Sequence, residues 1–196
     1  PIGVDQHLQG TSIGFVNSEI ENLERLHDLN KVAAIVIEPA RGHELEKNNL
    51  TSLRNLCNKY GIVFIYDEIT SGFRETIGGY HKKFEVRPDI AVFAKSMANG
   101  YAMSCVMGIK DVMKTAEKSF ISSTNWTESI GPTACLATIE FMEYNKAHEL
   151  IIDNGKKIKN IWNKIFNQKN DFNIEIYGID SLPAFKLSLE NSKPLE

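Results

Sequence analysis

The stretch that decides the fold reads Ile62-Val63-Phe64-Ile65-Tyr66-Asp67-Glu68-Ile69-Thr70-Ser71-Gly72-Phe73-Arg74. Its first five residues form an uninterrupted apolar run, and this run stops at two adjacent carboxylates, Asp67 and Glu68. Continuous apolar runs with β-branched residues are typical of strands that are covered on both faces, as in parallel sheets. The stretch therefore predicts a buried strand whose carboxyl end carries charged side chains.

Further predicted strands and helices flank this strand in the sequence. Other apolar runs cover residues 32–37, 90–94 and 102–109, and apolar residues at helical spacing cover residues 18–30 and 50–60. We expect Asn17 or Ser18 to be the N-cap of the first helix, and Gly61 to end the second. Strands that alternate with helices in this way predict an α/β fold with a mostly parallel sheet covered by helices.

The elements predicted near the end of the chain do not continue this alternation of strands and helices. Residues 129–144 and 148–167 predict two long helices, and residues 172–177 and 184–189 predict strands of a smaller α+β unit. We expect this smaller unit to be incomplete.

Composition narrows the class of protein. The 196 residues are 42% hydrophobic and 24% charged with a net charge of -3, as in soluble globular proteins, and they form no basic surface for nucleic acid. No apolar run approaches the roughly 18 residues that span a membrane, and the first residues do not resemble a signal peptide. Three scattered cysteines indicate reduced thiols, so we expect a cytoplasmic protein. From the charge and the apolar runs we expect neither membrane nor nucleic-acid partners.

Three of the predicted strands end in charged residues. Glu38 follows the strand at 32–37, Asp67 follows the strand at 62–66, and Lys95 follows the strand at 90–94. The carboxyl ends of strands carry the working residues in open α/β sheets, and a charge there is costly unless a partner or ligand compensates it. Each residue also has a purely structural interpretation: a turn residue for Glu38, a helix N-cap for Asp67 and a solvated loop residue for Lys95.

The motifs around these residues occur in a fixed order. They are Ala33-Ala34-Ile35-Val36-Ile37-Glu38-Pro39, the stretch from Phe64 to Arg74, Arg87-Pro88-Asp89-Ile90, Ala94-Lys95-Ser96-Met97-Ala98-Asn99-Gly100-Tyr101, and Thr124-Asn125-Trp126-Thr127 leading to Gly131-Pro132. Together they resemble the class III family of fold-type-I enzymes that depend on pyridoxal 5′-phosphate (PLP), which contains aminotransferases and glutamate-1-semialdehyde aminomutase. The resemblance covers about residues 30–145.

The resemblance assigns the two central roles. Lys95 matches the lysine that forms the Schiff base with the cofactor aldehyde and later moves a proton of the substrate. Asp67, 28 residues earlier, matches the carboxylate that keeps the ring nitrogen of the cofactor protonated. A protonated ring is the stronger electron sink, so both residue types suit this chemistry.

Supporting roles follow from the same resemblance. Ile69 matches an aliphatic residue on one face of the cofactor ring, and Glu38 matches an acidic residue near the ring substituents. Thr127 matches the residue that reaches the cofactor phosphate of the neighbouring subunit in a homodimer with shared active sites. Ordinary core packing for Ile69 and an N-cap for Thr127 remain alternatives.

The chain lacks parts that the family carries. Residues 1–30 contain no Gly/Ser/Thr-rich turn that could hold the cofactor phosphate. We therefore expect residues 1–145 to be part of the PLP-binding large domain and residues 146–196 to be the incomplete start of the small C-terminal domain. The chain is then a segment of a longer enzyme or a truncated relative, and by itself inactive.

The resemblance implies transamination between an amine or amino acid and a carbonyl acceptor. A glutamate-1-semialdehyde type of aminomutase is the alternative within the family, although the triple glycine that usually follows the aminomutase lysine is missing after Lys95. A non-catalytic module for assembly or binding is the alternative outside it. A nucleotide-binding domain is disfavoured, because neither GxGxxG nor GxxxxGK[ST] occurs.

Overall fold

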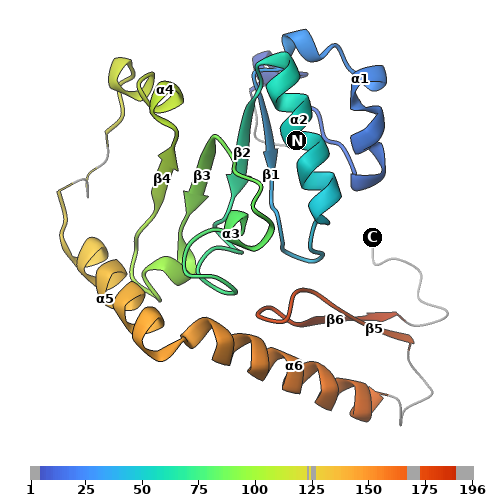
Figure 1. The fold of residues 1–196 in the computed structure, drawn as a ribbon, viewed down its shortest axis with the longest axis vertical. Coiled ribbons are helices and arrows are strands. Elements are labelled where there is room, and N and C mark those ends of the chain that lie inside the picture. Colours follow the sequence, from blue (N-terminus) through green and yellow to red (C-terminus); the bar gives the residue numbers. More distant parts are fainter. Residues whose placement is uncertain (1–4, 123, 125–126, 167–172, 189–196) are drawn as a thin grey trace.

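The computed structural model describes residues 5–122, 124, 127–166 and 173–188 (Figure 1). Its strands are β1 (Ala34–Ile37), β2 (Val63–Asp67), β3 (Ile90–Phe93), β4 (Cys105–Gly108), β5 (Asn173–Tyr177) and β6 (Ala184–Ser188). Its α-helices are α1 (Leu23–Leu26), α2 (Lys47–Tyr60), α3 (His81–Phe84), α4 (Lys110–Met113), α5 (Ile130–Asn145) and α6 (Ala147–Phe166).

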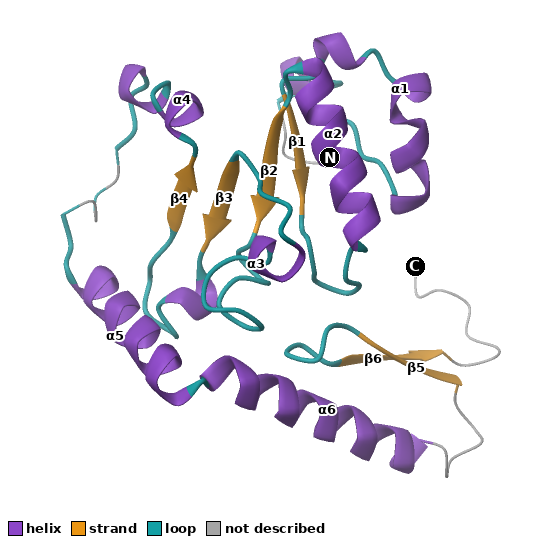
Figure 2. Ribbon diagram, in the orientation of Figure 1, coloured by secondary structure: helices purple, strands orange, loops and turns teal. Residues whose placement is uncertain are grey.

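The first four strands form one sheet in the order β1-β2-β3-β4 (Figure 2). The first three strands run parallel and β4 is antiparallel to β3, so the predicted mostly parallel α/β sheet is confirmed. The register pairs Ile37 with Tyr66 and Asp67 with Val92. Parallel pairing therefore brings the carboxyl ends of β1, β2 and β3 to one edge of the sheet.

Strand β1 is covered on one face only within the described residues. Along β1, Ile35 and Ile37 are buried, whereas Val36 between them is 57% exposed. Apolar side chains of α2, among them Leu50 and Leu53, belong to the same buried cluster as Ile35 and Ile37. The prediction that the β1 strand is covered on both faces is therefore wrong for the described structure, because no equivalent apolar cover lies over Val36.

The predicted helix at residues 18–30 is also wrong, because it is broken into short pieces. A 3-10 helix spans Asn17–Asn22, α1 follows it, and a second 3-10 helix spans Leu29–Lys31. His27 between them is extended, with φ -139°, and the N-cap of the first piece is Val16. The three-residue spacing of buried Ile20 and Leu23 suits the 3-10 geometry, in which such side chains are aligned.

The helix predicted at 50–60 is confirmed as α2, and it ends as expected. Gly61 adopts a left-handed conformation with φ 67°, and its N–H bonds to the carbonyl of Cys57. Glycine reaches this conformation without strain, which makes it the common residue at this position. Cys57 lies fully buried on the inner face of α2, and this burial raises the pKa of its thiol to about 11.

The two long helices predicted near the end of the chain are confirmed as α5 and α6, and the following hairpin β5-β6 forms a separate antiparallel sheet. The ring centroids of Trp162 on α6 and Phe185 on β6 lie 5.0 Å apart. A Cβ at Gly155 would lie 1.5 Å from the carbonyl oxygen of Asp180, so α6 approaches the hairpin turn at a distance that only glycine permits. In Figure 1 the hairpin lies beside α6, next to the loops that follow β1 and β2.

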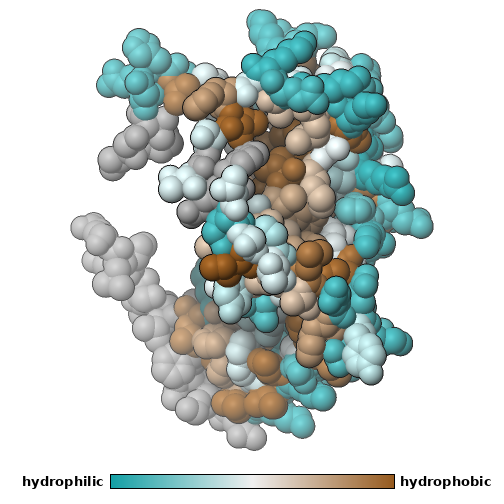
Figure 3. All heavy atoms as spheres, turned by 90° about the vertical axis from the view of Figure 1, so that its left-hand side faces the viewer, coloured by the Kyte–Doolittle hydropathy of each residue, from teal (hydrophilic) through white to brown (hydrophobic). Residues whose placement is uncertain are grey.

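The side of the molecule formed by β4 and α5 carries apolar side chains at its surface (Figure 3). The exposed residues of these elements include Val106, Met107, Ile130, Leu136 and Phe141.

No helix in the described ranges is long and apolar enough to cross a bilayer.

Candidate active site

The predicted site residues follow the ends of neighbouring strands. Glu38 comes directly after β1, Asp67 is the last residue of β2, and Lys95 follows β3 by two residues. Because Ile37 pairs with Tyr66, Glu38 and Asp67 occupy adjacent positions at the edge. The structure thus brings Glu38, Asp67 and Lys95 to one edge, as the sequence predicted.

Asp67 begins a tight turn at the end of β2. Its Oδ1 accepts a hydrogen bond of 3.0 Å from the backbone N–H of Ile69, the pattern of an Asx-turn. The alternative that Asp67 caps a helix is wrong, because a turn and not a helix follows it. Asp67 and Ile69 are both half-buried, and Oδ2 of Asp67 makes no hydrogen bond among the described residues. That oxygen is available to a ligand.

Lys95 has an unusual backbone conformation. Its φ is 49°, in the left-handed region that residues other than glycine seldom occupy, and a short 3-10 helix (Lys95–Met97) begins there. Strained residues of this kind gather at active sites, where the surrounding structure holds them in place. The side chain is exposed, and its Nζ donates a hydrogen bond of 2.8 Å to Oγ1 of Thr70.

Thr70 is a member of the site that sequence reasoning missed. It lies three residues after Asp67, and its hydroxyl meets an amine that is 25 positions away in the chain. The Nε of Arg74 donates to the carbonyl oxygen of Thr70 at 2.6 Å and so braces this loop. Burial lowers the pKa of the Arg74 guanidinium. The order of residues showed Thr70 beside Asp67 but gave no sign of its contact with Lys95.

Behind this turn lies a buried carboxyl group, Glu68. It is fully buried and accepts hydrogen bonds from the hydroxyl of Ser71 at 2.6 Å and the backbone N–H of Tyr80 at 2.5 Å. Burial raises the pKa of Glu68 to about 7, although both hydrogen bonds act in the opposite direction. Glu68 thus ties together the two ends of the loop between β2 and α3, the loop that contains Thr70.

Glu38 faces solvent rather than the Lys95 amine. It is exposed and forms an ion pair of 3.1 Å with Arg41, three residues further on. It also lines a cleft of about 320 Å³ next to Ile13 and Phe15. These contacts agree with the interpretation of Glu38 as a turn residue. Its role at the cofactor stays a prediction.

Thr127 lies on the exposed segment that leads into α5. Its alternative role as N-cap is wrong, because Ser129 occupies that position. The carboxylate of Glu128 satisfies the first amides of the helix instead, accepting from the N–H groups of Ile130 and Gly131 at 2.5 and 3.1 Å. An exposed Thr127 at a helix entrance is compatible with a ligand held between two subunits.

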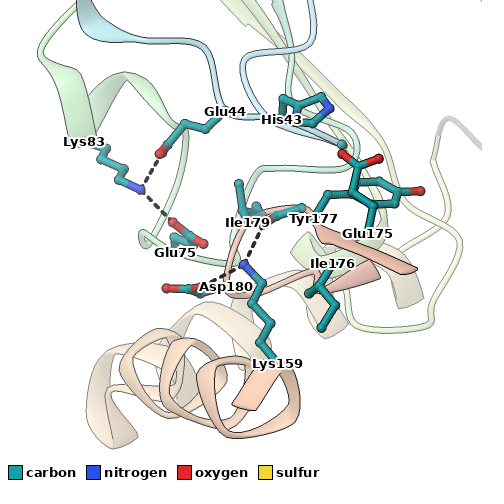
Figure 4. Close-up of a pocket in the computed structure, with 12 residues that line it drawn as sticks. His43, Glu44, Glu75, Lys83, Lys159, Glu175, Ile176, Tyr177, Ile179 and Asp180 are labelled. Atoms are coloured by element: carbon teal, nitrogen blue, oxygen red, sulfur yellow. Dashed lines mark hydrogen bonds and ion pairs between the residues drawn. The ribbon is translucent and has the colours of Figure 1, made fainter. Parts of the chain in front are cut away.

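A second cleft of about 410 Å³ opens between the loops after β1 and β2 and the hairpin (Figure 4). Lys83 spans it, with ion pairs of 2.5 Å to Glu44 and 2.9 Å to Glu75. From the other side, Lys159 pairs with Asp180 at 3.0 Å. Both lysines that line the cleft are held in ion pairs, so the cleft is a polar contact region between these loops and the hairpin.

The groups near Lys95 fit PLP. An exposed primary amine can bond to the cofactor aldehyde, and a carboxylate with one free oxygen can hold the ring nitrogen in its protonated form. Asp67 ends β2 and Lys95 follows β3 by two residues, so both lie at the carboxyl edge of the sheet, where an α/β sheet binds its ligands. The fold is that of the PLP-dependent transferases of type I.

Comparison with known proteins agrees. The model of the class-III aminotransferases matches residues 4–184, and the chain belongs to that family, whose cofactor is pyridoxal phosphate. The chain is 35% identical over 164 residues to 3-aminobutyryl-CoA aminotransferase of Cloacimonas acidaminovorans (strain Evry), covering 79% of this chain and 40% of the relative. It is 30% identical over 180 residues to glutamate-1-semialdehyde 2,1-aminomutase of Nitrosopumilus maritimus (strain SCM1), covering 88% and 38%.

Solved structures show the same fold. The FumI protein of Sphingopyxis sp. MTA144, solved in a form that carries PLP, superposes with a TM-score of 0.77 at 19% identity. The match covers 88% of this chain and 43% of that protein. The chain therefore spans about two fifths of the length of the relatives that it matches.

Proposed function

We propose that this chain supplies the cofactor lysine and its carboxylate partner to a longer PLP-dependent aminotransferase. The observation that carries the proposal is Lys95, an exposed amine on a strained backbone at the carboxyl edge of the sheet, next to the turn that begins at Asp67. Family membership supports amino-group transfer from an amine or amino acid to a carbonyl acceptor.

Each residue has a defined task in this proposal. Lys95 Nζ would hold the cofactor through its aldehyde carbon, with the carbonyl oxygen leaving as water, and the freed amine would carry the proton of the substrate Cα to C4′ of the cofactor. The free Oδ2 of Asp67 holds a proton on the ring nitrogen. The cofactor, when bound, supplies an electron sink for the pair left by the departing proton.

The supporting residues complete the proposed site. The half-buried side chain of Ile69 packs against the ring, and Glu38 lies near the ring substituents. Thr127, exposed at the entrance to α5, binds the cofactor phosphate of a neighbouring subunit. The proposed assembly is a homodimer, and the apolar side chains exposed along β4 and α5 support an interface on that side (Figure 3).

The proposed division of the chain follows the two sheets. Residues 1–145 belong to the large, cofactor-binding domain and residues 146–196 begin the small C-terminal domain. The separate hairpin sheet and its packing on α6 support that boundary. The three cysteines form no disulfide among the described residues, which supports a cytoplasmic location.

An aminomutase is the second candidate, because the 30% identity to glutamate-1-semialdehyde 2,1-aminomutase extends over 88% of the chain. A crossover experiment on the intact protein loaded with PLP tests both. A ¹⁵N-labelled amine is incubated with an unlabelled keto-acid acceptor, and the acceptor product is analysed by mass spectrometry.

Transamination is supported if the parent protein places ¹⁵N in the acceptor product and the Lys95→Ala variant does not. Conversion of a labelled amino aldehyde without exchange between molecules identifies the aminomutase instead. If Lys95→Ala transfers the amino group as fast as the parent protein, Lys95 does not have the proposed task.

A further inference from the structure

The Lys95 side chain poses a positioning problem. Four freely rotating bonds separate its amine from the backbone, and fixing such a chain costs up to about 2 kcal/mol of rotamer entropy. The side chain is exposed, so core packing does not hold it. Its backbone is anchored by the conformation with φ 49°, which sets the starting direction of the side chain but not the location of the amine.

The Thr70 hydroxyl fixes the location of the Lys95 amine by a hydrogen bond. Its Oγ1 accepts a hydrogen bond from Lys95 Nζ at 2.8 Å, the one hydrogen bond that the amine makes among the described residues. This distance lies within the usual range of an N–H···O hydrogen bond. The amine is thus held over the turn that begins at Asp67.

Thr70 in turn is fixed by its own surroundings. Its carbonyl oxygen accepts from Arg74 at 2.6 Å, and the N–H of Gly72 donates to the carbonyl of Glu68 at 2.8 Å. A threonine has one rotatable bond before its hydroxyl, and branching at Cβ restricts that bond further. Thr70 is therefore a stiff acceptor on a braced turn, well suited to hold a flexible partner.

From this geometry we infer that Thr70 is a positioning residue, whose hydroxyl holds the Lys95 amine where it captures the cofactor aldehyde. The inference rests on the proposed function of Lys95. It concerns the speed with which Lys95 reacts, and it assigns Thr70 no bond to the cofactor.

The test measures capture of PLP by individual lysines in the intact protein. Samples are mixed with PLP for varied times and reduced with borohydride, which converts the linkage to a stable secondary amine, and the modified lysines are then quantified by peptide mapping. Lys110, exposed and without a side-chain hydrogen bond among the described residues, is the internal standard. The readout is the ratio of the rates at Lys95 and Lys110.

The inference predicts that Thr70→Val, which keeps the shape but removes the hydroxyl, lowers this ratio about five- to tenfold, as expected for the loss of one ordinary hydrogen bond. Thr70→Ser restores the ratio to within about twofold of the parent. Thr70→Ala is a second hydroxyl-free variant should the valine variant fail to fold. A purely structural role would change melting behaviour without this rescue.

Two outcomes separate failure of the inference from failure of the proposed function. If the parent favours Lys95 and Thr70→Val favours it equally, Thr70 does not position the amine, while the role of Lys95 stands. If the parent modifies Lys95 no faster than Lys110, the proposed function itself fails and the inference with it.

Discussion

The carboxylate of Glu75 accepts hydrogen bonds from the backbone N–H and the hydroxyl of Ser181, 106 residues further along the chain, at 3.2 and 3.1 Å. Only 6% of the Glu75 side chain is exposed, and the same carboxylate pairs with Lys83. One side chain thus joins the loop after β2 to the turn between β5 and β6.

Glu75→Gln is expected to loosen the hairpin. Loss of the charge removes the Lys83 pair and weakens both bonds to Ser181, which costs about 2 kcal/mol. Hydrogen exchange should show faster exchange of the amides of β5 and β6, with β2 unaffected. Glu117→Gln, on an exposed segment, is the control. Equal exchange in parent and Glu75→Gln would show that Glu75 does not secure the hairpin.

The Glu75 contribution also depends on pH. Burial alone would raise the pKa of Glu75, but hydrogen bonds from Lys83 and Ser181 lower it below its usual value of 4.5. A lowered pKa in the folded state means that the stabilisation is present above pH 4.5 and is lost as the pH falls through the folded pKa. The difference in stability between parent and Glu75→Gln should therefore shrink in acid.

Glu68 is expected to have the opposite pH dependence. Its pKa is raised from 4.5 to about 7, so the folded protein retains a proton that the unfolded chain has lost. Stability contributed through Glu68 is thus complete below pH 4.5 and declines as the pH rises through 7, by about 3 kcal/mol at most.

Glu68→Gln removes this titration. Its stability relative to the parent, measured by urea unfolding, should rise between pH 4.5 and pH 7.5 and then level off. The exposed Glu140→Gln should show no such trend. A constant difference between Glu68→Gln and the parent across this range would mean that Glu68 does not titrate there.

Asp89, which directly precedes β3, is bonded to both β2 and α2. Its Oδ2 accepts from the backbone N–H of Phe64 at 2.8 Å and pairs with Arg54 of α2 at 2.9 Å, with both side chains less than one fifth exposed. Asp89→Ala leaves the Arg54 charge unpaired and should cost about 3 kcal/mol in unfolding free energy. Asp111→Ala, at a surface pair of 3.4 Å, should cost under about 0.5 kcal/mol. Similar losses in the two variants would contradict this account.

Gly72 is required by close packing. A Cβ there would lie 2.6 Å from Phe93 Cδ1 and 2.8 Å from the carbonyl oxygen of Glu68. Gly72→Ala should therefore lower the free energy of unfolding by about 1–3 kcal/mol. Gly14, whose added Cβ would meet nothing within 4 Å, gives a matched glycine-to-alanine control. Thermal unfolding of the two variants should separate them clearly.

The order of elements was predictable because it depends on local patterns. Apolar runs located β1, β2 and β3, and Gly61 located the end of α2. Helical spacing failed at residues 18–30, where side chains three apart serve a 3-10 helix as well as an α-helix. The prediction that β1 is buried on both faces was wrong. An apolar sequence shows that a strand face can be buried, but it does not show whether another element packs against that face.

The site was predictable only as far as strand ends locate it. Parallel strands necessarily bring Glu38, Asp67 and Lys95 to one edge. The contact between Thr70 and Lys95 depends on how a loop folds back over 25 residues, and no local pattern encodes it. Glu128 was missed because Thr127, the better N-cap residue, stands next to it.

The most direct test of the central claim is to locate the cofactor bond. The intact protein is saturated with PLP, reduced with borohydride and digested, and the modified lysines are identified by mass spectrometry. We expect one dominant phosphopyridoxyl group on Lys95, absent from Lys95→Ala. Modification spread evenly over exposed lysines such as Lys110, or concentrated at a lysine other than Lys95, would contradict it.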